Sequence, residues 1–225
     1  MRRTVVITGG TGALGRAVVE RMLGDEITCH LTWKFKNELK EFPHRDAVTL
    51  HEVDCGSDAE VVDFYAGLDS IDASIHIVGG FAVAAVEDTH RDDFVSMFEL
   101  NAITAFLCCR ESIRKMRSVG GGGCIVNVAA RPAVQPVGGM IAYTTAKAAV
   151  ASLTQCLAEE VRGEGIRVNA ILPSILDTPA NRHAMPDADF DRWPKPAEVA
   201  ETISFLASPD NRLTSGALVP VFGRA

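Results

Sequence analysis

Short apolar segments alternate with longer amphipathic ones along most of the 225-residue chain. The apolar segments are nearly continuous runs, which is typical of parallel strands covered on both faces. They predict strands at residues 4–8, 27–32, 48–53, 73–78, 124–128, 167–172 and 217–221. Helical spacing of the apolar residues between them predicts helices at 14–23, 58–66, 92–117, 141–162 and 196–207.

This alternation predicts an α/β fold, in which one doubly wound parallel sheet of about seven strands carries helices on both faces. The chain has no internal repeat and no long polar linker, so we expect residues 1–225 to form a single domain. The segment 173–196 is poor in strand patterns and rich in Pro, Asp and Asn. We expect this segment to form a flap over a site.

Composition and charge exclude several function classes. The formal net charge of −7 argues against a nucleic-acid-binding protein. No stretch approaches the roughly 20 apolar residues that a membrane helix needs. The six cysteines form no Cys-x-x-Cys pair and have no histidine nearby at metal spacing, which predicts free thiols and no metal site. We therefore expect a cytoplasmic protein.

A glycine-rich turn follows the first predicted strand directly, where residues 8–15 read TGGTGALG. Gly9, Gly12 and Gly15 allow a tight turn, a close backbone approach to a pyrophosphate and close packing of the next helix. The amino end of that helix also favours phosphate charge. The strand, turn and helix together predict dinucleotide binding.

The end of the second predicted strand indicates which dinucleotide binds. NAD sites usually carry an acid there to bond the ribose hydroxyls. Around residues 31–33 the chain has no acid, and Lys34 and Lys36 follow at once. The missing acid and the two cations favour NADP(H) over NAD(H), because the additional phosphate needs positive charge.

Tyr143 and Lys147 stand four residues apart in a predicted helix, so they share one face. An ammonium near a phenol favours the phenolate and is expected to lower the tyrosine pKa from about 10 toward working pH. Such a tyrosine can give a proton to a group that receives a hydride. The pair therefore predicts a proton donor tuned by a cation.

Further motifs occur in order along the chain: VDC at 53–55, GG at 79–80, ELN at 99–101, YTTAK at 143–147, VNAILPS at 168–174 and LTSGALVPV at 213–221. Together with the glycine-rich turn, they resemble the short-chain dehydrogenase/reductase family over nearly the full chain. The resemblance implies a Rossmann-type oxidoreductase that transfers a hydride between a nicotinamide cofactor and a small substrate. Ala13 departs from the pattern, since single-domain members often have a glycine there.

The resemblance also implies roles for individual residues. Tyr143 would donate the proton, Lys147 would also bond the nicotinamide ribose, and Asn101 would hold a water in a proton relay. The implied cofactor-binding residues are Thr8, Gly9, Gly12, Ala13, Leu14, Gly15, Lys34, Asp54, Cys55, Gly79, Gly80, Pro173, Ser174 and Thr178. The substrate would meet Ala130, Met185 and Trp193.

Ala130 occupies the position, thirteen residues before the tyrosine, where most family members have a serine. That serine bonds the substrate carbonyl oxygen as it gains charge. The dihydropteridine reductase branch also lacks it, and residues 172–193 resemble the corresponding region of that branch. Its substrate, quinonoid dihydropterin, takes up a hydride and a proton on a conjugated C=N system, where no oxyanion forms.

Three functions remain open at this stage. The first is an NADPH-dependent reductase of a quinonoid dihydropterin or a similar conjugated C=N substrate. The second is a carbonyl reductase of 3-oxoacyl or polyketide-like substrates, with a substitute for the serine. The third is an NADP-binding regulatory protein without turnover. The long apolar helices at 92–117 and 141–162 further predict a homodimer or homotetramer.

Overall fold

The computed structural model of the chain describes residues 2–23, 26–40 and 42–225. These residues form a seven-stranded sheet in the order β3-β2-β1-β4-β5-β6-β7. Each strand lies parallel to its neighbours. The strands are β1 (Arg3–Thr8), β2 (Ile27–Trp33), β3 (Thr49–Glu52), β4 (Ala73–His76), β5 (Gly123–Val128), β6 (Ile166–Pro173) and β7 (Leu218–Val221).

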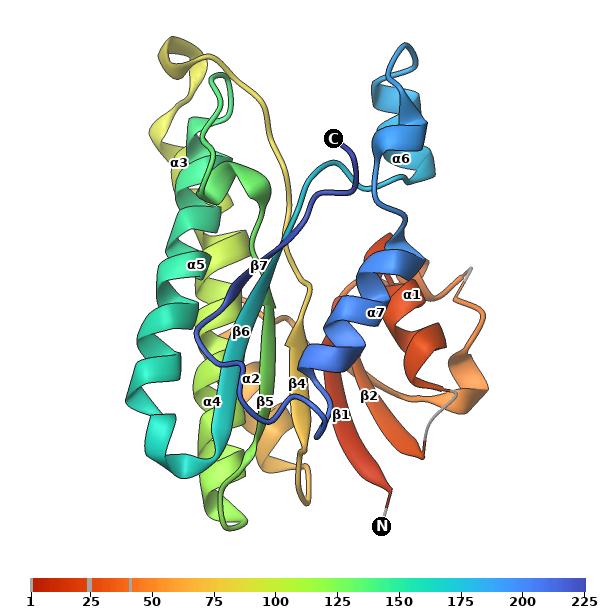
Figure 1. Cartoon of the computed structure of the whole chain (residues 1–225), viewed down its shortest axis with the longest axis vertical. Helices are drawn as coiled ribbons and strands as arrows, with labels where there is room; N and C mark the ends of the chain where they lie inside the picture. The colour runs from red at the N-terminus through yellow and green to blue at the C-terminus, as the bar shows by residue number, and fades with distance from the viewer. Residues whose placement is uncertain (1, 24–25, 41) are drawn as a thin grey trace.

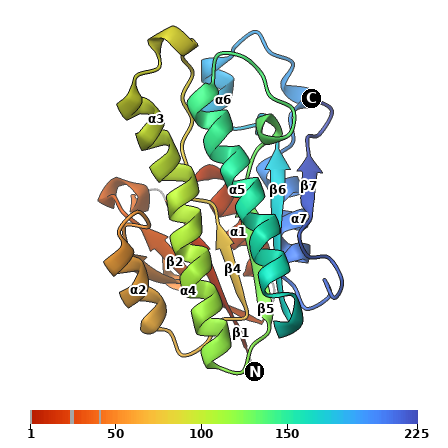
Figure 2. The same ribbon diagram turned by 90° about the vertical axis from the view of Figure 1, so that its left-hand side faces the viewer.

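Helices cover both faces of the sheet, as Figure 1 shows. α1 (Ala13–Met22) and α7 (Pro196–Leu206) pack against each other on one face. The other face carries α2 (Asp58–Ala66), α4 (Thr104–Ser118) and α5 (Ile141–Glu160), and Figure 2 shows α4 and α5 side by side along it. α3 (Arg91–Phe98) and the short α6 (Pro179–Ala184) lie beyond the upper end of the sheet in Figure 1.

Alternating side chains of β1 separate the two core layers, as expected for a strand buried on both faces. Val5 and Ile7 join the cluster beneath α1 and α7, where Val18 and Ile203 are also fully buried. Val6 joins the cluster beneath α2, α4 and α5. The prediction of a doubly wound parallel sheet of about seven strands is confirmed.

The order of the strands determines where a ligand can bind. β2 follows β1 outward in one direction, and β4 leaves β1 in the other, so the order reverses between β1 and β4. In open α/β sheets, ligands bind outside the carboxyl ends of the strands at such a reversal. The glycine-rich turn, which follows β1, lies at this point.

Two segments differ from the expected helices. The predicted helix at 92–117 is divided, because a π-helical turn (η4, Glu99–Ile103) separates α3 from α4. Within the expected flap, residues 179–184 form α6, whose amino end carries the cap residue Thr178 and then Pro179. These local signals for a helix start are strong, but a six-residue helix is too short to give a periodic apolar pattern. No helix in the described part of the chain combines the length and apolar character of a membrane span.

Candidate active site

The glycine-rich turn is so compact that it excludes side chains at two positions. Gly9 has a φ of +68°, and a methyl group there would lie 2.9 Å from the backbone nitrogen of Val78 on the neighbouring chain segment. A methyl group on Gly15 would lie 2.2 Å from the carbonyl oxygen of Gly9. Gly12 caps the amino end of α1. The turn therefore brings bare backbone and a helix amino end to one place, as pyrophosphate binding requires.

A cleft of about 690 Å³ opens above this turn, and we call it the main cleft. Eight of the predicted cofactor-binding residues line it, namely Gly9, Gly12, Ala13, Leu14, Lys34, Asp54, Cys55 and Gly79. The residues that the sequence analysis missed are Thr11, Thr32, Trp33, Phe35, Glu38, Val53, Ile77, Val78, Leu100 and Thr104. Most of these follow a strand end or neighbour a predicted residue, so their closeness in the sequence to the glycine-rich turn and the strand ends could have identified them.

The remaining predicted cofactor residues lie outside the lining of the main cleft. Thr8 is buried beneath the turn, and its hydroxyl has no hydrogen-bond partner in the protein. Gly80 exchanges hydrogen bonds with Asn101. Ser174 donates its hydroxyl to the Phe222 carbonyl at 2.8 Å, and the Thr178 hydroxyl accepts from the Asn181 amide at 3.2 Å. Pro173 ends β6, and the chain from there through Ser174 to Thr178 leads to α6.

Charged side chains at the β2 end of the main cleft are paired with each other or with a hydroxyl. The Lys34 ammonium lies 2.6 Å from Asp54 Oδ2. Burial raises the pKa of Asp54, but the contacts with Lys34 and with the Gly56 amide outweigh burial and hold this pKa below its ordinary value. Glu38, in the turn η1 (Lys36–Leu39), accepts a hydrogen bond from the Thr11 hydroxyl at 2.7 Å. Lys36 is exposed and does not line the cleft. Lys34 therefore lies in the main cleft together with Glu38, an acid beyond the strand end that was not among the predicted residues.

Asn101 lies in the π-helical turn η4 and is almost completely buried. Its amide nitrogen donates to the Met97 carbonyl at 2.9 Å and to the Gly80 carbonyl at 3.2 Å. Its amide oxygen accepts from the Gly80 amide at 3.2 Å. Single π-helical turns often occur at functional sites, and this one brings a buried amide side chain to the carboxyl end of β4.

Lys147 is buried on α5 and donates to the carbonyl oxygen of Val128, at the end of β5, at 2.8 Å. Burial lowers the pKa of Lys147 to about 8. A methyl group on Gly79 would lie 2.6 Å from Asn101 Oδ1 and 3.2 Å from Lys147 Nζ. The two polar heads therefore converge on one bare backbone position that also lines the main cleft.

Tyr143 lies one helical turn before Lys147 on α5. Burial raises the pKa of its phenol to about 12. The expectation that Lys147 lowers this pKa is therefore wrong for the protein alone, because the ammonium is directed to the Val128 carbonyl and burial dominates. The ring of Phe81 packs edge-on against Tyr143, with centroids 4.9 Å apart. Asn101, Tyr143 and Lys147 are the residues that the motifs predict to be catalytic, and we refer to them together as the catalytic cluster.

Ala130 is buried immediately after β5, in extended backbone. Ala129 beside it packs into an apolar cluster with Ala102, Ala170 and Leu172. The side chains at 129 and 130 thus offer a substrate only methyl groups. Thr144, next to the tyrosine, has a buried hydroxyl without a partner in the protein.

The two predicted substrate residues of the 173–196 segment differ in exposure. Met185 ends α6 and is half-buried. Trp193 is buried, and its ring packs against Phe190 with centroids 5.0 Å apart. The segment is further tied down where the Asp177 amide donates to the Pro194 carbonyl at 3.0 Å. In this structure Trp193 packs the segment onto the protein.

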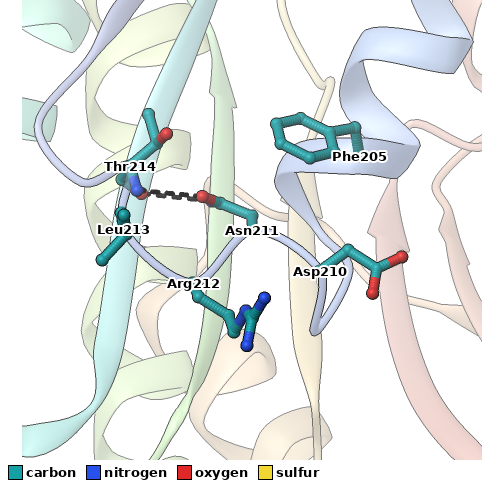
Figure 3. Close-up of a pocket in the computed structure, with 6 residues that line it drawn as sticks. All are labelled: Phe205, Asp210, Asn211, Arg212, Leu213 and Thr214. Carbon is teal, nitrogen blue, oxygen red and sulfur yellow. Dashed lines mark hydrogen bonds between the residues drawn. The ribbon is translucent and has the colours of Figure 1, made fainter.

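A second cavity, of about 530 Å³, lies near the amino ends of the strands (Figure 3). It is lined by Phe205, Asp210, Asn211, Arg212, Leu213 and Thr214. Asn211 turns toward Thr214, whose backbone amide donates to the Asn211 side chain at 3.0 Å. The loop rejoins the sheet where the Gly216 amide donates to the Val168 carbonyl of β6. This cavity is at the opposite end of the sheet from the catalytic cluster.

Among the described residues, no group of three or more His, Cys, Asp or Glu is arranged to hold a metal ion.

Comparison with known proteins identifies the class to which this site belongs. The family model described as short chain dehydrogenase matches residues 3–189. The chain belongs to this family of oxidoreductases, which confirms the resemblance that the motifs indicated.

Individual relatives cover nearly the whole chain. A dihydropteridine reductase from Dictyostelium discoideum is 30% identical, over 97% of this chain and 94% of its own length. An NADPH-dependent aldehyde reductase-like protein of Arabidopsis thaliana chloroplasts is 25% identical, over 98% of this chain and 93% of its own. The crystal structure of BdcA in complex with NADPH superimposes with a TM-score of 0.89 at 26% identity, covering 99% of this chain and 93% of that one.

Proposed function

We propose that the protein is an NADP(H)-dependent reductase of a conjugated C=N substrate such as a quinonoid dihydropterin, with Tyr143 as proton donor. The observation that carries this proposal is the combination of the catalytic cluster, in which Asn101 and Lys147 are buried and Tyr143 is half-buried, with methyl groups at Ala129 and Ala130. A carbonyl substrate needs a donor for its oxyanion, whereas a C=N substrate needs a proton donor alone. The similarity to a dihydropteridine reductase supports the same substrate class.

The residues of the main cleft fit a dinucleotide. Gly9 and Gly12 keep its floor free of side chains, Gly15 lets α1 pack close to the turn, and the amino end of α1 faces a pyrophosphate favourably. The unpartnered hydroxyl of Thr8 beneath the turn is a further polar group available at this place. The cation of Lys34 and the NADPH complex of a structural relative support NADP(H) as the cofactor.

When bound, the reduced nicotinamide supplies a hydride. The phenol of Tyr143 stays protonated at neutral pH, because burial holds its pKa at about 12, and it can give that proton to the substrate nitrogen. Lys147, with a pKa of about 8, is mostly an ammonium at pH 7 and favours the phenolate that this transfer leaves. Asn101 would hold the water through which the phenolate regains a proton.

We also propose the remaining organisation of the protein. Residues 1–225 form one domain, and residues 173–196 act as a flap whose Met185 meets the substrate. The exposed apolar side chain of Phe106 on α4 supports a homodimer or homotetramer. The free cysteines support a reducing, cytoplasmic location.

The test is NADPH oxidation with three substrate classes: quinonoid dihydropterin, simple diketones and 3-oxoacyl thioesters. We expect turnover of the pterin, and we expect Tyr143→Phe to reduce it by ~10²–10⁴-fold while NADPH binding survives. The chain's other tyrosine provides the control. Tyr65 is buried on α2 and its hydroxyl lies 2.8 Å from Ser74 Oγ, so Tyr65→Phe should keep turnover.

Two outcomes would contradict the proposal. Turnover of 3-oxoacyl thioesters alone would indicate a carbonyl reductase in which another group replaces the serine. Tight NADPH binding with no turnover of any of the three classes would indicate a regulatory protein.

A further inference from the structure

Glu38 is an acid in the main cleft that lies five residues beyond the end of β2 at Trp33. The turn η1 follows β2 and directs this side chain back to the glycine-rich turn. One carboxylate oxygen accepts the Thr11 hydroxyl at 2.7 Å, and the other accepts the Phe35 amide at 3.0 Å. The carboxylate is therefore fixed between the glycine-rich turn and the end of β2.

The charges around this carboxylate leave little net attraction for a phosphate. Lys34, Glu38 and Asp54 are the charged side chains among the described residues that line the cleft. Lys34 is paired with Asp54 at 2.6 Å. Arg16 does not line the cleft, and its Nε donates to the Thr11 carbonyl at 2.7 Å. One cation and two acids give the lining a formal charge of −1.

The two nicotinamide dinucleotides differ at the adenosine ribose, which this fold binds between the glycine-rich turn and the end of β2. A free 2′-hydroxyl can donate a hydrogen bond to a carboxylate there. A 2′-phosphate would instead bring negative charge against that carboxylate, and like charges in contact oppose binding. Glu38 thus weakens the binding of the 2′-phosphate, whereas Lys34 strengthens it.

We infer that Glu38, held by Thr11, sets the ratio of NADH to NADPH affinity. It favours the unphosphorylated ribose and limits the preference for NADPH that Lys34 provides. This inference rests on the proposed dinucleotide site. It predicts that the preference for NADPH over NADH that Lys34 provides is narrow.

The experiment is a fluorescence titration of NADPH and NADH with the wild-type protein and three variants. Glu38→Gln keeps the shape of the side chain and removes its charge: the amide oxygen can still accept from the Phe35 amide, and the amide NH2 can donate to the Thr11 hydroxyl. We expect it to raise the NADPH-to-NADH affinity ratio on the order of tenfold. Lys34→Ala should shift the same ratio in the opposite direction. Asp46→Asn, at an exposed acid in the turn η2 (Arg45–Ala47), changes the net charge equally and should leave the ratio unchanged.

Each other result has a distinct meaning. If both dinucleotides bind and Glu38→Gln gives the same ratio as Asp46→Asn, the inference about Glu38 is overturned and the proposed site stands. If a change in ratio appears equally in Asp46→Asn, net charge explains it and the inference is again overturned. If neither dinucleotide binds the wild-type protein, the proposed function itself fails.

Discussion

The main cleft and the catalytic cluster lie next to each other, but their charged and titratable groups differ. Those of the main cleft are paired and partly exposed, whereas those of the catalytic cluster have pKa values that burial shifts. In the main cleft, Lys34 is paired with Asp54, and Glu38 is hydrogen-bonded to Thr11. These groups are partly exposed, so their charges are screened by water. In the catalytic cluster, burial moves the pKa of Tyr143 up to about 12 and that of Lys147 down to about 8.

The difference separates recognition from chemistry. Paired charges near solvent select a ligand by shape and hydrogen bonding at small energetic cost. Burial makes the proton of Tyr143 harder to lose and the proton of Lys147 easier to lose. Such shifted pKa values are typical of functional sites. Gly79 joins the two regions, because it lines the main cleft and lies against both Asn101 and Lys147.

The largest effect is expected from a substitution that disrupts the main cleft and leaves the catalytic cluster unchanged. Gly15→Ala would place a methyl group 2.2 Å from the Gly9 carbonyl, so α1 must move away from the turn. Overpacking of this kind costs ~1–3 kcal/mol or more, and we expect NADPH binding to weaken on the order of a hundredfold. Fluorescence titration measures this change.

The matched control for Gly15→Ala is Gly138→Ala, where a methyl group would meet open space. Gly138 lies outside the lining of the main cleft, so this variant should bind NADPH as wild type does. Equal binding by wild type and Gly15→Ala would show that the turn does not hold the dinucleotide.

The sequence predicts the main cleft better than the catalytic cluster, for a physical reason. The glycines and the strand ends are local features, and the turn at residues 8–15 folds as its spacing requires. The pKa of Tyr143 depends on burial and on the direction of the Lys147 side chain, which Val128 on a different element determines. Glu38 was missed because a short turn, and no regular element, brings it back to Thr11.

The second prediction concerns the catalytic cluster and the dependence of stability on pH. The pKa of Lys147 is about 8 in the folded protein, against an ordinary value of 10.5. Between these values the unfolded chain holds a proton that the folded protein has lost, so this residue adds stability as the pH rises. The contribution between pH 8 and pH 10 is roughly 2 kcal/mol.

Chemical denaturation without nucleotide from pH 7 to pH 10 checks this prediction. The stability difference between wild type and Lys147→Met should grow in favour of wild type across the range. Above pH 10 the raised pKa of Tyr143 acts in the opposite direction, because the unfolded chain loses the phenolic proton while the folded protein keeps it, so stability falls between about pH 10 and about pH 12. Lys40→Met, at an exposed position, should follow wild type. A difference between wild type and Lys147→Met that stays constant with pH would contradict the assignment.

The smallest effect is expected from a substitution at Ala130, the position beside the catalytic cluster that lacks a hydroxyl. Ala130→Ser restores the donor that most family members have there. For a quinonoid pterin no oxyanion develops, and a buried hydroxyl without a partner costs ~1–3 kcal/mol, so kcat/KM should stay level or fall. For a simple diketone an oxyanion does develop, and kcat/KM should rise by roughly tenfold. The measurement is kcat/KM for both substrates in wild type and Ala130→Ser, with Ala133→Ser, on the neighbouring turn η5 (Arg131–Ala133), as the control. A large gain on the pterin would mean that its reduction does build negative charge beside Ala130, and the C=N explanation for the missing serine would then be wrong.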